Sequence, residues 1–314
     1  MWRSCRTPAN AIFPPGFSAS KTIPPKNRRP PLNHTVFRGD AASKSNLTPP
    51  FFLRYDKTNT LQVKSTLDGT IQPSLFFHPQ TDISVPLVVG LHTWSYDRFN
   101  QLENYLPLCK QYGWALLLPE FRGPNLASNP NARDACGSRK ARRDVLDAIE
   151  YAARVAPIDS RNIFLLGCSG GGQAALLTAE DAPDLFRAVD VWCPVSDLTA
   201  WHARLISTHQ HYVHDMEACL GGSPDKLADE YAARSPLEHL ASLKDLPVSI
   251  HHGRYDDVVP YRHSLDFVRK LEDAGAEEVY FEVFDGGHEQ FPSHSFEWFA
   301  RLAGRSGEAV RITG

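Results

Sequence analysis

The sequence predicts an α/β fold in which a mostly parallel sheet is covered by helices on both faces. Beyond residue 51, apolar runs typical of strands alternate with segments of helical spacing. The apolar runs are nearly continuous, as expected for parallel strands that are buried on both faces. No internal repeat with a period of about 20–50 residues is visible, which argues against a solenoid. Because the 314-residue chain is 42% hydrophobic, it can bury a large core, and we expect one domain over residues 51–314.

The strands are predicted from apolar runs bounded by turn residues. The first two flank a turn at Asp68-Gly69 within residues 61–79, because such a dipeptide between two apolar runs is typical of a hairpin. The others are expected within residues 86–92, 114–120, 162–169, 186–197, 246–253 and 278–287.

The helices are predicted from apolar residues that recur every three or four positions. They are expected over residues 99–113, 142–156, 171–181, 263–275 and 293–304. Gly113 ends the first of them, as glycine commonly does. In the second, Val145, Ile149 and Ala152 share one face. Strands and helices therefore alternate through most of the chain.

Residues 1–50 are predicted to be a disordered, basic and proline-rich extension. They hold nine of the 24 prolines, and eight Lys or Arg residues against one acid give them a charge of +7. Two interpretations stay open: an organellar transit peptide, or a plain tail, since the prolines oppose a continuous amphipathic helix. The compartment is therefore not fixed by the sequence, although a soluble cytoplasmic protein is slightly favoured.

Charge and cysteine content exclude several classes of protein. The net charge is −3, so the chain beyond residue 50 carries −10, which argues against a nucleic-acid partner. No apolar run approaches the ~18 residues of a membrane span, so no membrane partner is expected. Six scattered cysteines without a CxxC do not form a disulfide scaffold, and Cys168 and Cys193 fit buried strand positions. A bridge between Cys136 and Cys219 is left open, as is the oligomeric state.

The segment Gly167-Cys168-Ser169-Gly170-Gly171 fits the G-x-S-x-G motif, with a strand before it and a helix after it. In this context a sharp turn projects the serine above the sheet beside a helix N-terminus, where N–H groups favour a developing negative charge. We therefore predict that Ser169 is a catalytic nucleophile.

A serine nucleophile needs a histidine base that is held by a carboxylate. His288 follows the last strand behind two glycines, where it can reach over the sheet edge. Asp256 and Asp257 follow the strand before it, and Asp197 follows an earlier strand. Asp197 also fits the N-cap of the next helix.

The oxyanion hole is expected to use the backbone N–H of Gly170 and a second N–H from the loop after residues 86–92. That loop reads His92-Thr93-Trp94-Ser95-Tyr96, so the second donor is predicted to be Trp94. One such donor contributes roughly 3–4 kcal/mol to stabilising the transition state.

These motifs resemble those of the α/β-hydrolases of the prolyl oligopeptidase-like, peptidase S9-type group. The resemblance covers residues 60–304 and rests on GCSGGG, LGGSPDKLADEYAARSPLEHL, LPVSIHHGRYDDVVP and GGHEQF. Matched position by position, it implies a triad of Ser169, Asp256 and His288. The chain departs from the group in reading His-Thr where His-Gly is usual at residues 92–93, and it lacks the residues for a β-propeller.

Residues 197–235 interrupt the alternation of strands and helices, and we expect them to form a small cap over the serine. Trp94, Tyr96, Trp201 and His202 are predicted to bind substrate, and Tyr212 is a further candidate wall of the pocket. His209, His211 and His214 could suggest zinc, but no fourth ligand accompanies them, so no metal and no cofactor are expected.

The main prediction is a serine esterase that cleaves small acyl esters, including carbohydrate-linked ones, through an acyl-enzyme, because nothing in the chain resembles the filter that screens peptides in the larger enzymes. The alternative is a small S9-type serine exopeptidase, for which an acidic pair in the cap would bind the substrate amine. A non-catalytic binding protein on the same scaffold is the third hypothesis.

Overall fold

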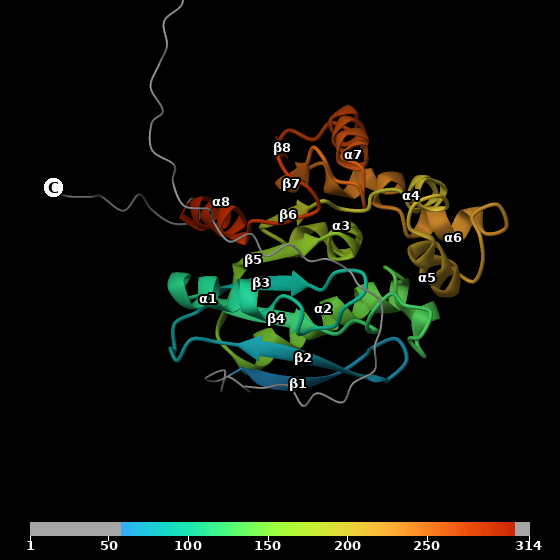
Figure 1. Ribbon diagram of the computed structural model, residues 1–314. Coiled ribbons are helices and arrows are strands. Elements are labelled where there is room, and N and C mark those ends of the chain that lie inside the picture. The colour runs from blue at the N-terminus through green and yellow to red at the C-terminus, as the bar shows by residue number, and fades with distance from the viewer. Residues whose placement is uncertain (1–57, 305–314) are drawn as a thin grey trace, which may run out of the picture. The chain divides into compact units, whose positions relative to one another are not determined.

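The computed structural model describes residues 58–304, and these form one eight-stranded sheet with helices on both faces (Figure 1). The sheet has the strand order β1-β2-β4-β3-β5-β6-β7-β8. The predicted extension over residues 1–50 lies outside the described residues. Among the described helices, none is long and apolar enough to cross a lipid bilayer.

The strands confirm the expected pattern. They are β1 Asn59–Lys64, β2 Ile71–Phe77, β3 Val85–Leu91, β4 Ala115–Pro119, β5 Ile158–Cys168, β6 Ala188–Trp192, β7 Val248–Gly253 and β8 Val279–Phe284. β3 to β8 run parallel. β1 and β2 form the predicted antiparallel hairpin, and β2 also pairs antiparallel with β4. The carboxyl ends of six parallel strands therefore meet at one edge, where ligand sites gather in such folds.

Two layers of helices cover the sheet. The helices are α1 Leu102–Tyr112, α2 Arg139–Val155, α3 Gly170–Asp181, α4 Leu198–Leu205, α5 Gln210–Leu220, α6 Ala228–Ala233, α7 Arg262–Asp273 and α8 Pro292–Gly304. α2, α3 and α7 pack into one buried apolar cluster, and α1 and α8 into another on the opposite face. As predicted, Gly113 caps α1 in the left-handed conformation, and Val145, Ile149 and Ala152 are buried on α2.

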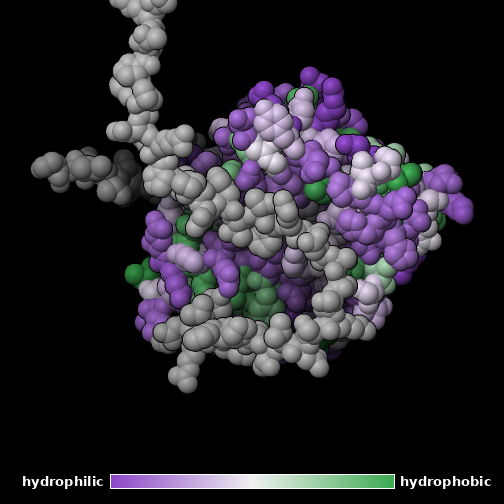
Figure 2. Space-filling view, viewed as in Figure 1, coloured by the Kyte–Doolittle hydropathy of each residue, from purple (hydrophilic) through white to green (hydrophobic). Residues whose placement is uncertain are grey.

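The segment between β6 and β7 contains α4, α5 and α6, in the region where the sequence predicts a cap. Figure 1 shows these three helices beyond the end of the sheet toward which the arrow of β3 points. Their buried residues form a third apolar cluster, which includes Trp94 and Trp201. The outer surface over these helices is mostly hydrophilic in the view of Figure 2. The apolar side of the segment therefore faces the carboxyl edge of the sheet.

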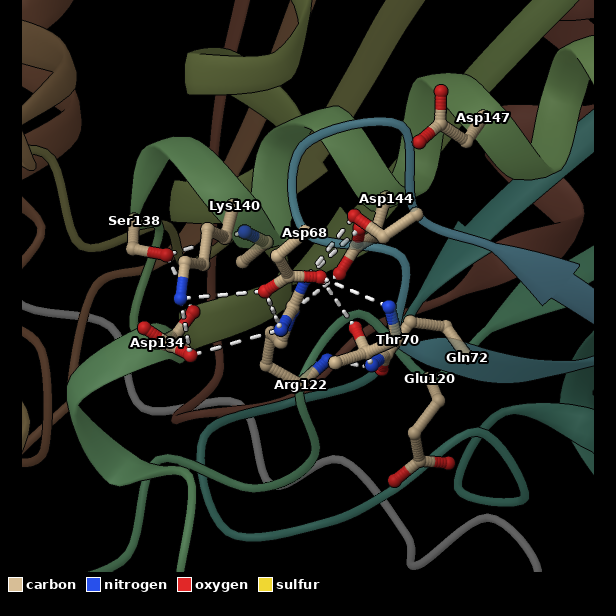
Figure 3. A network of polar contacts seen from close by, with 12 residues as sticks. Asp68, Thr70, Gln72, Glu120, Arg122, Asp134, Ser138, Lys140, Asp144 and Asp147 are labelled. Carbon is tan, nitrogen blue, oxygen red and sulfur yellow. Dashed lines mark hydrogen bonds and ion pairs between the residues drawn. The ribbon is translucent and has the colours of Figure 1, made fainter.

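A buried arginine ties the hairpin to the first helix layer (Figure 3). Arg122 follows β4 in a left-handed conformation, with φ of 80°, and its side chain is 3% exposed. Its guanidinium donates to Asp144 on α2 at 2.5 Å and to Asp68 in the β1–β2 turn at 2.8 Å. Because both carboxylates are held by one cation, the hairpin cannot shift without breaking a charge-assisted hydrogen bond.

Candidate active site

Ser169 lies in the sharp turn that the motif predicts, between β5 and α3. Its φ is 57° and its ψ is −122°, values that a residue with a side chain adopts at an energetic cost of roughly 1–3 kcal/mol. Its N–H donates to the carbonyl of Trp192 at 2.8 Å, which ties the turn to β6. The strained backbone places the serine at the carboxyl edge of the sheet, directly at the N-terminus of α3.

The flanking glycines are required by close backbone approach. A Cβ at Gly167 would lie 2.2 Å from the carbonyl oxygen of Gly171, and a Cβ at Gly171 would lie 2.6 Å from that of Leu91. Real Cβ atoms do not approach other atoms so closely. The glycines of the motif therefore allow the turn, as the sequence predicts.

Asp256 and His288 come together at the same edge, after β7 and β8. Nδ1 of His288 lies 2.7 Å from Oδ2 of Asp256. Because an ionised carboxylate only accepts, Nδ1 carries the proton and Nε2 is left as a lone-pair nitrogen. The N–H groups of Val258 and Val259 donate to Oδ1 of Asp256 at 3.0 and 2.8 Å.

These contacts keep the Asp256 carboxylate ionised. Burial alone would raise its pKa, but the hydrogen bonds from His252, His288 and the Val259 N–H lower the pKa far below its ordinary value. The carboxylate is fully buried, whereas the His288 side chain is 23% exposed. The Nδ1 edge of the imidazole therefore contacts the fixed negative charge of Asp256, while another part of the ring is accessible to an incoming molecule.

Cys193 connects this pair to Ser169. The residue follows Trp192, whose carbonyl accepts from Ser169, and its thiol lies 3.5 Å from the carbonyl oxygen of Glu289. Its Sγ lies within 4.8 Å of ligand atoms of Asp256 and His288. The loop that carries His288 therefore packs against Cys193, and the preceding residue, Trp192 at the end of β6, accepts the hydrogen bond from Ser169.

Two backbone N–H groups are available beside the serine. A Cβ on Gly170 would lie 3.0 Å from the backbone nitrogen of Trp94, so the two residues are in close contact. Neither N–H donates a hydrogen bond to another described residue. His92 supports the loop, with its two ring nitrogens 3.0 Å from the carbonyls of Thr93 and Glu120. The predicted pair of donors is thus adjacent and free of competing partners within residues 58–304.

Of the three candidate carboxylates, only Asp256 contacts His288. Asp257 is exposed, and the side chain of Asp197 accepts from the N–H of Ala200 at 2.9 Å. Asp197 is therefore the N-cap of α4, which is the alternative role that the sequence offered.

The predicted pocket residues divide into an exposed and a buried group. Tyr96 is 56% exposed, whereas Trp94 and Trp201 are 2% and 0% exposed and pack edge to face at 4.8 Å. His202 is also buried and is held by Glu217 at 2.8 Å. Trp201 therefore packs in the apolar cluster that includes Trp94, whereas His202 contacts Glu217 and the Tyr231 ring, and a role of either residue in binding substrate stays a prediction.

The histidines of α5 and its N-terminus do not gather around a metal site. Within residues 58–304, the single group of three side chains with ligand atoms close enough to share an ion is Cys193, Asp256 and His288. His209, His211 and His214 do not belong to it. Cys136 and Cys219, for which a bridge was left open, are both buried and free.

Two contributors to the site were missed at the sequence level. The sequence analysis placed His252 only within the predicted strand over residues 246–253, yet its Nε2 lies 3.2 Å from Oδ2 of Asp256. Cys193 was expected to be a small buried apolar residue, and it is buried, but its thiol also contacts the loop of His288. The position of His252, four residues before Asp256 at the same strand end, was the available signal.

Comparisons with known proteins agree with this arrangement. The family model described as "Prolyl oligopeptidase family" matches residues 102–310. Rat "Inactive dipeptidyl peptidase 10" is 26% identical over 165 residues, which cover 50% of this chain and 19% of the relative. The "Dipeptidyl aminopeptidase BIII" of Pseudoxanthomonas mexicana is 25% identical over 215 residues, which cover 67% of this chain and 31% of the relative.

A solved structure shares the fold. That of an acylaminoacyl peptidase from Pyrococcus horikoshii has a TM-score of 0.61 and 20% identity, and the match covers 79% of this chain and 40% of that one. The chain thus spans less than half the length of each of these three proteins. Since the family model covers about two thirds of the chain, and the sheet order and the motifs agree with it, the chain belongs to the prolyl oligopeptidase family of α/β-hydrolases.

Proposed function

We propose that the protein is a serine peptidase that cleaves short peptides through an acyl-enzyme intermediate. The observation that carries the proposal is the 2.7 Å contact between His288 and Asp256 at the sheet edge where Ser169 occupies its strained turn. Nucleophile, carboxylate and base then follow the order along the chain that is usual for this architecture.

In the proposed mechanism, Nε2 of His288 takes the proton of Ser169 Oγ while the oxygen attacks the substrate carbonyl. Asp256 holds the imidazole in the tautomer with the proton on Nδ1 and stabilises the cation that forms. The N–H groups of Gly170 and Trp94 bind the developing oxyanion. His288 then protonates the leaving amine, and a water molecule repeats the sequence to release the acid. No cofactor takes part.

The comparisons support a peptidase over the esterase that the sequence favoured. The names of the matched proteins are those of peptidases, and the family model is that of oligopeptidases. The expectation of an esterase rested on the apparent lack of a peptide filter. Short peptides need no such filter, so that argument does not exclude cleavage of amide bonds.

We infer that a charged substrate amine is not specifically bound by the segment between β6 and β7. An acidic pair would be needed there, but the three least exposed acids of its α5–α6 part already have partners. Asp215 accepts from the N–H of Ala127 at 2.8 Å, Glu217 contacts His202, and Glu230 pairs with Arg234 at 3.1 Å. The proposal therefore favours peptides with a neutral, acylated N-terminus. In this proposal the segment acts as a cap, and Tyr212 of α5 and Tyr96 of the loop after β3 are the accessible aromatic walls of the pocket.

Family membership alone does not establish catalysis, because one matched relative carries the name "Inactive". A non-catalytic binding protein is thus the competing hypothesis. The geometry of Ser169, Asp256 and His288 favours an enzyme, since a binding protein has no need for a strained serine beside a buried Asp–His pair.

The test compares three substrates on purified protein: an acetyl-aminoacyl anilide, the matching anilide with a free amine, and a short-chain p-nitrophenyl ester. We expect Ser169-dependent cleavage of both the acetylated anilide and the more reactive ester, with the acetylated anilide preferred over the free amine. Cleavage of the ester alone would favour the carboxylesterase. Cleavage of none would favour the binding protein, and activity that persisted in Ser169→Ala would refute the nucleophile.

A further inference from the structure

Three side chains of different chemistry converge behind the imidazole of His288. Sγ of Cys193, a carboxylate oxygen of Asp256 and a ring nitrogen of His288 all lie within 4.8 Å of one another. They come from three successive strand ends, of β6, β7 and β8. Thiolate, imidazole and carboxylate are the three ligand types that zinc prefers in proteins, and three such side chains with a water in the fourth position complete an open zinc site.

We propose that Cys193, Asp256 and His288 form an inhibitory site for a thiophilic divalent cation such as Zn²⁺. That the cation inhibits rests on the proposed function of His288, but the binding itself does not.

The geometry fits one ion after small side-chain movements. Zinc lies about 2.3 Å from sulfur and about 2.0–2.2 Å from nitrogen and oxygen, so ligand atoms around one ion are separated by roughly 3–4 Å. The three atoms are already within 4.8 Å, and the 2.7 Å contact between Nδ1 of His288 and Oδ2 of Asp256 has to open slightly to admit the ion.

The charges of the site also balance. Asp256 is already ionised, and binding releases one proton, that of the Cys193 thiol. Two negative ligands then face a doubly positive ion, so the buried group has no net charge. The thiol gives up its contact with the carbonyl of Glu289, which is weak at 3.5 Å.

Binding at Nδ1 of His288 would abolish its role as a base. Nδ1 now carries the proton that it donates to Asp256. When the metal takes the Nδ1 lone pair, the neutral ring carries its proton on Nε2 instead. Nε2 then has no free lone pair to accept the proton of Ser169. The metal therefore blocks the base and removes its carboxylate partner in one step.

Access to the site is through the partly exposed imidazole. Cys193 is 0% exposed, the Asp256 side chain is fully buried, and the His288 side chain is 23% exposed. The ion has to enter past His288, so we expect inhibition to develop slowly and to reverse when a chelator is added.

The experiment titrates the purified full-length chain with Cd²⁺ alone, which reports a bound thiolate by its ultraviolet charge-transfer absorption. We expect the absorption in the wild type, a reduced absorption in both Cys193→Ala and His288→Ala, and no reduction in Cys109→Ala. Cys109 is a matched control, because it is a buried free cysteine on α1 whose thiol lies 3.7 Å from the carbonyl of Ala115, at the start of β4. Cys193→Ser provides a variant of similar volume if Cys193→Ala does not fold.

A second measurement follows the inhibition of hydrolysis by Zn²⁺. For each variant, the rate with Zn²⁺ is divided by the rate of the same variant without Zn²⁺, so that differences in basal rate cancel. The half-inhibitory concentration should rise at least roughly tenfold in Cys193→Ala, since even an indirect partner of a metal site contributes that much affinity. Equal inhibition of Cys193→Ala and wild type, or an unchanged Cd²⁺ absorption, would overturn the site. If the absorption behaves as expected but no substrate is cleaved, the metal site stands and the proposed function fails.

Discussion

Nε2 of His252 lies 3.2 Å from Oδ2 of Asp256, and both side chains are completely buried. Nε2 also lies 2.7 Å from the carbonyl of Val259, and Nδ1 lies 2.7 Å from the hydroxyl of Ser264. Since the carbonyl and carboxylate oxygens accept, Nε2 carries the proton, and Nδ1 accepts from Ser264. His252 thus holds the same carboxylate oxygen that orients His288.

We predict that His252→Gln lowers kcat by roughly 10–100-fold and leaves KM nearly unchanged, as expected for a residue that positions a catalytic group. Steady-state kinetics on the best substrate will measure this, with a thermal melt to check folding. Ser264→Ala should act in the same direction with a smaller effect. His239→Gln is the control, because His239 is exposed and contacts the carbonyl of Ala232. A parallel rise in KM would point to a structural role instead.

Asp256→Asn should lower kcat by about 10⁴, because an amide at this position allows the wrong tautomer of His288. The adjacent Asp257→Asn is the matched control, since this carboxylate is exposed. It should keep kcat within a few fold of the wild type. Equal losses in both variants would contradict the assignment of Asp256.

Gly253→Ala should displace the loop of His288. A Cβ at Gly253 would lie 2.0 Å from the carbonyl oxygen of Gly287 and 2.6 Å from that of Gly286, and backbone atoms cannot yield as a side chain can. We expect kcat/KM to fall at least tenfold, because a displacement of a catalytic group by about 1 Å can lower the rate by roughly 10²-fold. Gly287→Ala is the control in the same loop, because its Cβ would meet nothing within 4 Å. A wild-type rate in Gly253→Ala would show that the loop adapts.

The sequence predicted the residues whose roles depend on local motifs. The strand, turn and helix around Ser169 are set by neighbouring residues, so its conformation could be expected, and so could the positions of Asp256 and His288 at parallel strand ends. The packing of Trp201 and His202 could not, because apolar spacing does not tell which side of a short helix faces a partner. The same holds for Cys193, whose contact with the His288 loop depends on how far β8 extends beyond β6.

The network around Arg122 was equally invisible in the sequence, since Asp68 and Asp144 are separated from it by 54 and 22 positions. We predict that Arg122→Met lowers the free energy of unfolding by about 3–5 kcal/mol, because the buried Asp144 loses its cation. Denaturant unfolding will measure the change. Arg161→Met is the control: Arg161 is 71% exposed in its ion pair with Asp159, so the loss of this pair should lower stability much less than the loss of Arg122 does. Similar losses in the two variants would contradict a structural role for the Arg122 network.

Glu180, near the end of α3, should destabilise the protein at neutral pH. Its carboxylate oxygens have no hydrogen-bond partner among the described residues, and burial raises its pKa to about 9. Below its ordinary pKa of about 4.5 the group is protonated in both the folded and the unfolded chain, and it has no effect on stability. As the pH rises, only the unfolded chain ionises, so stability is lost until the folded group titrates as well.

We therefore predict that Glu180→Gln raises the free energy of unfolding by up to about 3 kcal/mol at pH 7 and changes it little at pH 4. The glutamine keeps the shape of the protonated acid but cannot ionise in the unfolded state. Chemical denaturation at the two pH values gives the difference, and other titrating groups cancel between variant and wild type. Glu272→Gln, at an exposed position on α7, should change stability by less than about 0.5 kcal/mol at both pH values. A gain of equal size at pH 4 and pH 7 would mean that ionisation of Glu180 is not its cause.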